Sequence, residues 1–169
     1  MLLLAGLVAA QPAWAADPPS LAVFDLELYD TSGEPAQPEQ DARLQKVTAE
    51  LRDRISASGR YKVVSLPAPA SAELQRCDDC AITKATQSGA DLALVGLVHK
   101  VSTLILKMTL ILREVPSGAM RGTWTADFRG NTDESWQRAA RWLLRNRVLA
   151  TPARTRHPDE AGRRHQPAD

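Results

Sequence analysis

Hydrophobic residues recur with two different periods along this chain, and the change of period marks the expected elements. In residues 103–115 every second residue from Leu104 to Leu112 is apolar, the period of two that is typical of a half-buried strand. From Asp41 to Ser58 apolar residues return every three or four positions, which predicts a helix. By the same criterion we expect strands at residues 20–30, 60–66, 90–102 and 120–129, and helices at residues 79–88 and 132–149.

The order of these elements predicts the fold class. Two early strands are each followed by a helix and then by another strand, which favours parallel neighbours with right-handed connections. The last three strands are joined by short links, which favours an antiparallel meander. We therefore expect an α/β (α+β) fold, with a single mixed sheet of about five strands and three helices packed on it.

The two ends of the sequence differ in composition from its middle. Residues 1–15 combine a short apolar run with the tripeptide Ala-Trp-Ala at residues 13–15, which is typical of a signal peptide. Residues 150–169 hold three prolines and many charges but almost no large apolar side chain, which predicts a disordered tail. Residues 16–149 are expected to form one domain with its own core.

Charge and apolar length exclude two classes of partner. The chain has 21 Lys and Arg against 20 Asp and Glu, without the basic excess of a protein that coats nucleic acid. The longest later apolar stretch, residues 92–112, is interrupted by His99, Lys100 and Lys107, so stable insertion into a membrane is not expected. Together with the signal peptide, this predicts a periplasmic or secreted protein.

Four segments, taken as a set, resemble a known family. They are Phe24-Asp25, residues 58–64, residues 89–98 and residues 113–118. The set is similar to secreted proteobacterial proteins of unknown function whose domain resembles the TolB amino-terminal domain, and the similarity covers about residues 20–149. The resemblance implies an α/β fold and an exported location, and it implies no catalytic residue. Because TolB-like domains act in envelope assembly through protein contacts, it also implies a class of function.

Cys77 and Cys80, the two cysteines of the chain, lie where a helix is expected to begin. We interpret them as a structural disulfide, because the chain is expected to be exported and its cysteine count is even. A redox-active dithiol is the first alternative, since a helix N-terminus lowers a thiol pKa, but the carboxylates of Asp78 and Asp79 oppose this effect. A zinc site is the second alternative, but it needs about four ligands and His99 is the one histidine outside the predicted tail. We expect no metal and no cofactor.

Two surfaces are candidates for binding. The first is a recognition loop for a partner or small ligand, made of Arg129, Asn131, Asp133, Glu134 and Trp136. The plainer interpretation of this segment is a strand exit followed by a helix that Asn131 caps, with Glu134 completing a capping box.

The second surface is a basic stripe on the last helix. Arg138, Arg141 and Arg145 fall at helical spacing, with Trp142 beside them. Such a stripe is either a solvated face or a contact surface for an acidic partner or anionic head groups.

Signals for an enzyme are weak, since the chain contains no GxSxG sequence and His99 is the one candidate base in the expected domain. We therefore expect an exported, non-enzymatic module that binds an envelope protein or a small ligand. The first alternative is a thiol–disulfide protein acting through Cys77 and Cys80, and the second is a small hydrolase.

Overall fold

The computed structural model describes residues 17–71, 77 and 79–150. The predicted signal peptide and, apart from residue 150, the predicted tail lie outside the described residues. The strands are β1 (Ser20–Val23), β2 (Glu27–Asp30), β3 (Lys62–Val64), β4 (Leu92–Lys100), β5 (Ile105–Glu114) and β6 (Met120–Arg129). The helices are α1 (Pro38–Ala57), α2 (Cys80–Gln87) and α3 (Asp133–Leu143), which continues into the π-helix η1 (Leu144–Val148).

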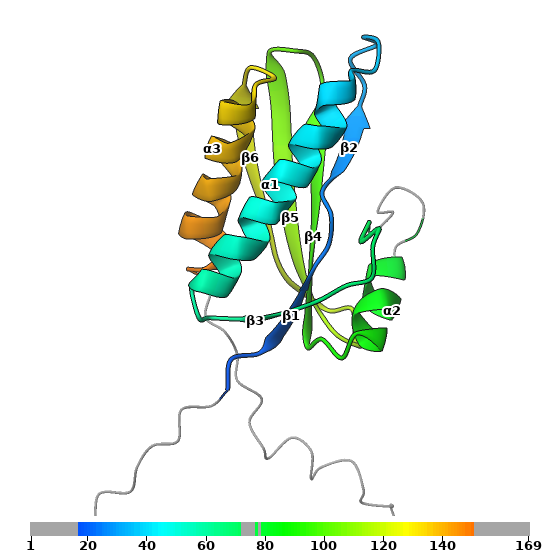
Figure 1. The fold of residues 1–169 in the computed structure, drawn as a ribbon, viewed down its shortest axis with the longest axis vertical. Coiled ribbons are helices and arrows are strands. Elements are labelled where there is room, and N and C mark those ends of the chain that lie inside the picture. The colour runs from blue at the N-terminus through cyan, green and yellow to red at the C-terminus, as the bar shows by residue number, and fades with distance from the viewer. Residues whose placement is uncertain (1–16, 72–76, 78, 151–169) are drawn as a thin grey trace, which may run out of the picture.

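The described strands form one mixed sheet in the order β3-β1-β4-β5-β6, and β2 also pairs with β4 (Figure 1). β1 is parallel to β3 and to β4, whereas β4, β5 and β6 are antiparallel neighbours. This topology confirms the expected fold class, with parallel pairs from the helical connections and a meander from the short ones.

The strand expected at residues 20–30 is divided into β1 and β2, so the described sheet has six strands rather than about five. Both pieces pair with β4, and the backbone N–H of Phe24 still donates to the Leu94 carbonyl at 3.0 Å, but residues 25 and 26 leave the ladder. Asp25 bridges to Ser71 instead, and the backbone N–H of Leu26 donates to Thr48 Oγ1 at 3.0 Å. Because these partners replace the lost ladder bonds, the interruption leaves those backbone groups satisfied.

The two faces of the sheet are covered unequally. α1 and α3 cover one face, where the larger core cluster includes Leu51, Met108 and Trp136 (Figure 1). α2 covers the other face only near the start of β4, where it packs on Phe24 and Val95. Among the described residues no helix covers this second face toward the β4–β5 hairpin.

The predicted cap of the last helix is wrong by one residue. The N-cap of α3 is Thr132, which forms a capping box with Ser135, in place of Asn131 and Glu134. The reason is that the Asn131 side-chain oxygen already accepts a hydrogen bond from the Trp136 indole at 3.0 Å.

Candidate functional site

The uncovered end of the sheet exposes a group of apolar side chains. Six large hydrophobic side chains are exposed among the described residues, and four of them lie at or beside the β4–β5 hairpin. These four are Tyr29 (44 % exposed), Val101 (44 %), Leu104 (65 %) and Ile105 (54 %). With the neighbouring His99, Lys107 and Arg129 they form what we term the hairpin patch.

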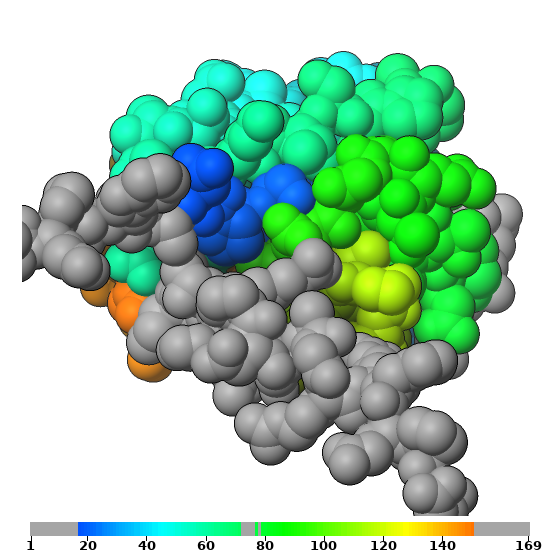
Figure 2. All heavy atoms as spheres, turned by 90° about the horizontal axis from the view of Figure 1, so that it is seen from below, coloured from blue at the N-terminus to red at the C-terminus, as the bar shows by residue number. Residues whose placement is uncertain are grey.

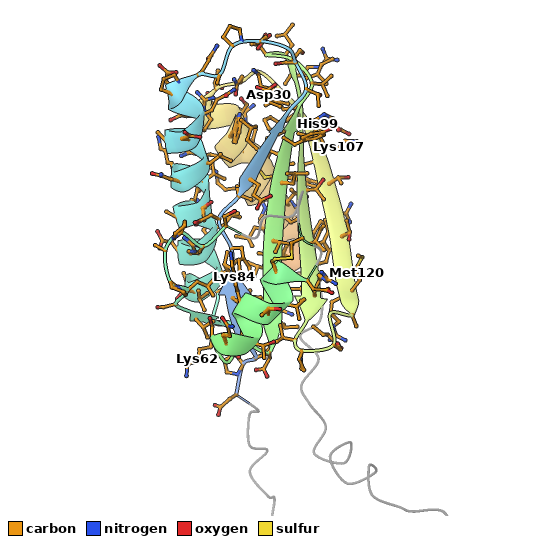
Figure 3. The ribbon with its side chains drawn as sticks, turned by 90° about the vertical axis from the view of Figure 1, so that its right-hand side faces the viewer. Asp30, Lys62, Lys84, His99, Lys107 and Met120 are labelled. Atoms are coloured by element: carbon orange, nitrogen blue, oxygen red, sulfur yellow. A yellow bond between two sulfur atoms is a disulfide. The ribbon has the colours of Figure 1, made fainter. Side chains whose placement is uncertain are left out.

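Strand register brings the patch together. Tyr29 pairs with His99, and His99 pairs with Lys107, so these side chains form a row across three strands. Ile105 pairs with Arg129 on β6 and lies two residues before Lys107, hence on the same face. Figure 3 shows His99 and Lys107 close together toward the side of the sheet away from α1.

Leu104 belongs to the hairpin turn. The expectation that it shares the buried face of the strand is wrong, because β5 begins one residue later, at Ile105. The backbone N–H groups of Val101 and Ser102 both donate to the carbonyl of Ile105, at 3.0 and 3.2 Å, and close the turn. The turn thus projects Leu104 beyond the sheet.

His99 is held by two neighbours. Its ring lies 4.9 Å from the Tyr29 ring, and its Nε2 atom lies 2.8 Å from Thr31 Oγ1. A hydroxyl and an imidazole at this distance resemble a nucleophile and its base, but a hydrolase also needs a group that orients the imidazole. Among the described residues no carboxylate contacts the His99 ring.

A buried cation lies behind the patch, on the helix-covered face. Lys100 is 0 % exposed, and its Nζ lies 3.0 Å from Asp30 Oδ2 and 2.8 Å from Glu34 Oε2. The same ammonium group donates to Ser32 Oγ at 3.2 Å. These contacts tie the loop of residues 31–37 to the end of the sheet. The sequence offered no signal for this cluster, because Lys100 looked like a polar residue at a strand end.

The Lys100 cluster shifts the pKa values of its members. Burial acts to raise the pKa of Asp30, but hydrogen bonds from Ser32 and Lys100 outweigh it and lower this pKa to about 2. The pKa of Lys100 is raised, chiefly by Glu34, against the opposing effect of burial and with Asp30 adding to the rise. Asp30 and Lys100 are therefore both charged at neutral pH.

Trp136, from the predicted recognition loop, is a core residue. Its side chain is 0 % exposed and its ring packs edge-on to Phe128, with centroids 6.3 Å apart. The Arg43 guanidinium lies 5.6 Å from the ring centroid, and its NH1 group donates to Asn131 Oδ1 at 2.8 Å. Trp136 and Asn131 thus hold the start of α3 against α1.

The other residues of the predicted loop divide between α1 and solvent. Asp133 accepts hydrogen bonds from Arg43 and Lys46, each at 2.9 Å, and these two contacts lower its pKa. Glu134 and Arg129 are exposed. Among the described residues the Arg129 side chain has no hydrogen-bond or ion-pair partner, and Arg129 is the one member of the predicted loop that lies in the hairpin patch.

The predicted basic stripe is partly paired. Arg138 forms an ion pair with Glu134 one turn earlier, and Arg141 lies 3.4 Å from Glu50 of α1. Arg145 is exposed on η1. The stripe is therefore a weaker positive surface than three adjacent arginines suggest.

Cys77 and Cys80 are joined by a disulfide, with Cα atoms 5.5 Å apart. Cys80 is the first residue of α2, and the carboxylate of Asp79, the residue before it, lies 3.7 Å from the Arg113 guanidinium. Asp78 lies outside the described residues.

A shallow cleft of about 290 Å³ lies at the carboxyl ends of β1 and β3. Its lining residues are Asp25, Arg52, Val63, Val64, Ser65, Leu66, Ala68 and Ala70. Open α/β sheets bind ligands at this position. Here, however, the Asp25 carboxylate accepts from Arg52 at 2.9 Å and from the Ala70 backbone N–H at 2.9 Å, so it holds the loop in place.

Within the part of the chain that the structure describes, no group of three or more His, Cys, Asp or Glu side chains is placed to hold a metal ion. None of the described helices has the length and apolar character that crossing a membrane requires.

The chain belongs to the DUF3280 family, described as "Protein of unknown function (DUF2380)", whose model matches residues 19–148. This confirms the expected resemblance to a family of unknown function. No curated protein matches the chain.

Several solved structures are similar in fold. The PelC dodecamer from Paraburkholderia phytofirmans is 19 % identical, with a TM-score of 0.54 over 83 % of this chain and 92 % of that one. Lipoprotein GNA1162 from Neisseria meningitidis is 14 % identical, with a TM-score of 0.51 over 83 % of this chain and 100 % of that one. TolB from Acinetobacter baumannii is 14 % identical, with a TM-score of 0.51 over 81 % of this chain but only 29 % of that one. These likenesses concern the fold, and they confirm the expected TolB-like domain.

Proposed function

We propose that the chain is an exported, non-enzymatic binding module that docks a protein partner on the hairpin patch. The observation that carries this proposal is that four of the six exposed large hydrophobic side chains of the described residues gather at the β4–β5 hairpin, where no described helix covers the sheet. Single exposed apolar residues are ordinary on protein surfaces, whereas a contiguous group marks a site of association.

The composition of the patch indicates the chemistry of the partner. Tyrosine and arginine dominate the binding energy of many interfaces, and the patch holds Tyr29 and Arg129 on one face. The charged side chains beside its apolar centre are Arg129 and Lys107, with Asp127 3.8 Å from Lys107 Nζ as the opposing carboxylate. A partner with an apolar anchor and acidic side chains around it complements this surface.

The patch rests on a rigid support. Backbone ladders hold Tyr29, His99 and Ile105 on three paired strands, and the Lys100 cluster ties down the adjoining loop. A surface that is already ordered loses less conformational freedom when a partner binds.

Two similar structures support a module that works through protein contacts in the cell envelope. PelC assembles as a dodecamer, and GNA1162 is a lipoprotein. A lipoprotein fits the setting that the predicted signal peptide indicates, a periplasmic or secreted protein.

Photo-crosslinking tests the hairpin patch. A photoreactive residue at Leu104, in the protein exported by its own cell, should form a discrete adduct with a partner. The matched control is the same residue at Met120, which is 66 % exposed but lies at the other end of β6. We expect Ile105→Asp to reduce the Leu104 adduct at least tenfold, because one desolvated charge costs an interface about 2 kcal/mol or more. Equal adducts at both positions, or an adduct that survives Ile105→Asp, would contradict the proposal.

A thiol–disulfide function is the second candidate, because Cys80 begins α2 and a helix N-terminus stabilises a thiolate. We expect instead that the disulfide is structural. The variant Cys77→Ser/Cys80→Ser should lose at most about 2 kcal/mol of unfolding free energy, since the two cysteines are only three residues apart. Urea unfolding measures this loss, and an insulin-reduction assay should show no turnover by the native protein. Rapid turnover would favour the redox function.

A further inference from the structure

The outer edge of β6 is the longest open strand edge among the described residues. β6 is 10 residues long and its one partner among the described strands is β5, whereas β3, at the opposite margin of the sheet, has 3 residues (Figure 1). Proteins usually shorten, bend or cover such an edge, because its unpaired N–H and C=O groups are a template for another strand. A long edge of this kind therefore marks a place where a strand can be added.

Hydrogen bonding fixes which backbone groups of β6 point outward. The N–H of Gly130, the residue after β6, donates to the carbonyl of Leu104 at 3.2 Å and so points toward β5. In an antiparallel ladder alternate residues of one strand bond to the same neighbour. No described residue hydrogen-bonds the backbone groups that point away from β5. These groups belong to the exposed residues Thr123, Thr125, Asp127 and Arg129.

The start of β6 lacks this regular edge. The register of β5 and β6 shifts between Leu112 and Arg113, and this bulge interrupts the alternation near Met120. The β5–β6 turn also lies against α2, where Gly118 approaches Ile82, and Figure 2 shows the turn in yellow-green beside α2 in green. The open edge is thus residues 123–129, at the end of β6 that adjoins the hairpin patch.

The two faces of the open edge carry different side chains. On the helix-covered face the Trp124 ring lies along the strand, in the space that a Cβ of Gly122 would fill. On the other face lie Asp127 and Arg129, and Lys107 Nζ is 3.8 Å from the Asp127 carboxylate. The side chains of the edge that are half-buried against the larger core cluster are Trp124, Ala126 and Phe128.

We infer that the partner of the hairpin patch adds a strand of its own to the open edge of β6, an inference that rests on the proposed function. The two surfaces are continuous, because Arg129 pairs with Ile105 and Asp127 with Lys107. The added strand supplies the hydrogen-bond partners that the outward backbone groups lack, and such main-chain bonds provide the affinity of strand addition. The partner therefore presents an extended segment.

The side chains of the edge specify the pattern of that segment. Its apolar residues pack beside Trp124, and they alternate with polar residues on the open face. In the antiparallel arrangement a cation lies opposite Asp127 and an anion opposite Arg129. The described carboxylates that follow on α3 do not fill the second place, since Asp133 pairs with α1 and Glu134 with the same helix.

A second copy of this chain fits the edge less well. When two copies of β6 pair antiparallel about a twofold axis, Asp127 comes opposite Arg129 only if the strands overlap at residues 127–129. Overlap along the whole of residues 123–129 instead places Asp127 opposite Thr125, and Arg129 opposite Thr123. A copy of β6 thus cannot satisfy both the charges and the outward backbone groups.

Amide hydrogen exchange of the full exported chain, resolved by residue with NMR, tests the inference. The probe is the synthetic peptide Glu-Val-Lys-Val-Thr-Val-Thr, which in antiparallel pairing places glutamate opposite Arg129 and lysine opposite Asp127. The outward amides of residues 123–129 should exchange rapidly in the free chain and at least about tenfold more slowly with millimolar peptide. The amides of Gly122 and Ala126, which point toward β5, should be protected in both states.

The control peptide Lys-Val-Glu-Val-Thr-Val-Thr has the same composition with its two charges exchanged. It should bind the native chain about tenfold more weakly, since both cross-strand charge pairs become repulsive. The variant Asp127→Arg/Arg129→Asp keeps the net charge and should reverse this preference. No protection by either peptide, or a preference that the variant leaves unchanged, would overturn the inference. So would outward amides already protected in the free chain, either at every protein concentration, through cover by the chain itself, or increasingly with concentration, through a second copy.

Photo-crosslinking separates this inference from the proposed function. Thr125→Pro should reduce the Leu104 adduct about tenfold, because the ring removes one outward N–H and blocks a second backbone while the bonds to β5 remain. Circular dichroism verifies the fold, and the charge-swap variant tests the edge if the proline variant does not fold. An adduct that survives in folded Thr125→Pro would overturn the added strand and leave the hairpin patch as the docking site. No Leu104 adduct, with outward amides that the peptide protects, would overturn the proposed function alone.

Discussion

Replacing Trp136 by alanine should lower the free energy of unfolding by about 3–5 kcal/mol, the usual cost of removing a large aromatic side chain from a core. Trp136 is 0 % exposed, its ring packs against Phe128, and its indole N–H donates to Asn131. Alanine would leave a cavity, and the Asn131 oxygen would keep only the hydrogen bond that it accepts from Arg43. The melting temperature should fall on the order of 10–15 °C.

Trp142→Ala is the matched control, since it removes the same side chain from a site that is 40 % exposed on the same helix. We expect this variant to lose less than about 1 kcal/mol, and thermal unfolding followed by circular dichroism compares the two. Similar losses in the two variants would show that the buried Trp136 side chain does not stabilise the core more than the exposed Trp142 does. If Trp136→Ala had a weak effect on stability and a strong effect on partner binding, the result would support the predicted recognition loop.

The sequence was sufficient to predict the fold because local pattern and global topology agree. The alternation from Leu106 to Leu112 and the helical period from Val47 to Ile55 match the faces that the structure buries. The segment of residues 120–129 was predicted as a strand with the bounds that β6 has. Such agreement between the local hydrophobic pattern and the burial in the folded chain is expected of a sequence that specifies one structure.

The candidate site was harder to predict, since it depends on contacts between residues far apart in the chain. Tyr29 and Ile105 look like ordinary strand residues until the register places them on the part of a face that no described helix covers. Trp136 sits among polar residues in the sequence and was therefore grouped with a recognition loop, although its side chain points into the core. Which face of a sheet stays open depends on where α2 ends, and periodicity does not reveal that.

Lys100→Met should lower the free energy of unfolding by about 2–4 kcal/mol, because it leaves two carboxylates without their shared counter-ion. The side chain of Lys100 is 0 % exposed, whereas those of Asp30 and Glu34 are 23 % and 32 % exposed, so water compensates part of the loss. Lys107→Met is the matched control. It removes the same charge from a neighbouring strand at a side chain that is 50 % exposed, and it should cost about 0.5 kcal/mol or less.

Two experiments distinguish the loss of charge from the loss of packing as the cause of the lower stability of Lys100→Met. One removes the carboxylates, and the other varies the pH. If the uncompensated carboxylates cause it, the triple variant Lys100→Met/Asp30→Asn/Glu34→Gln should regain most of the stability, since no carboxylate is left without its counter-ion.

In the native chain the pKa of Asp30 is lowered from 3.8 to about 2, so its contribution is complete above pH 3.8 and is lost as the pH falls toward 2. Without Lys100 this pKa should rise toward 3.8, and the variant should lose less additional stability over that window. Urea unfolding at neutral pH and along an acid series measures both effects. A triple variant as unstable as Lys100→Met, with an unchanged acid dependence, would mean that Lys100 acts through packing of its aliphatic chain rather than through charge.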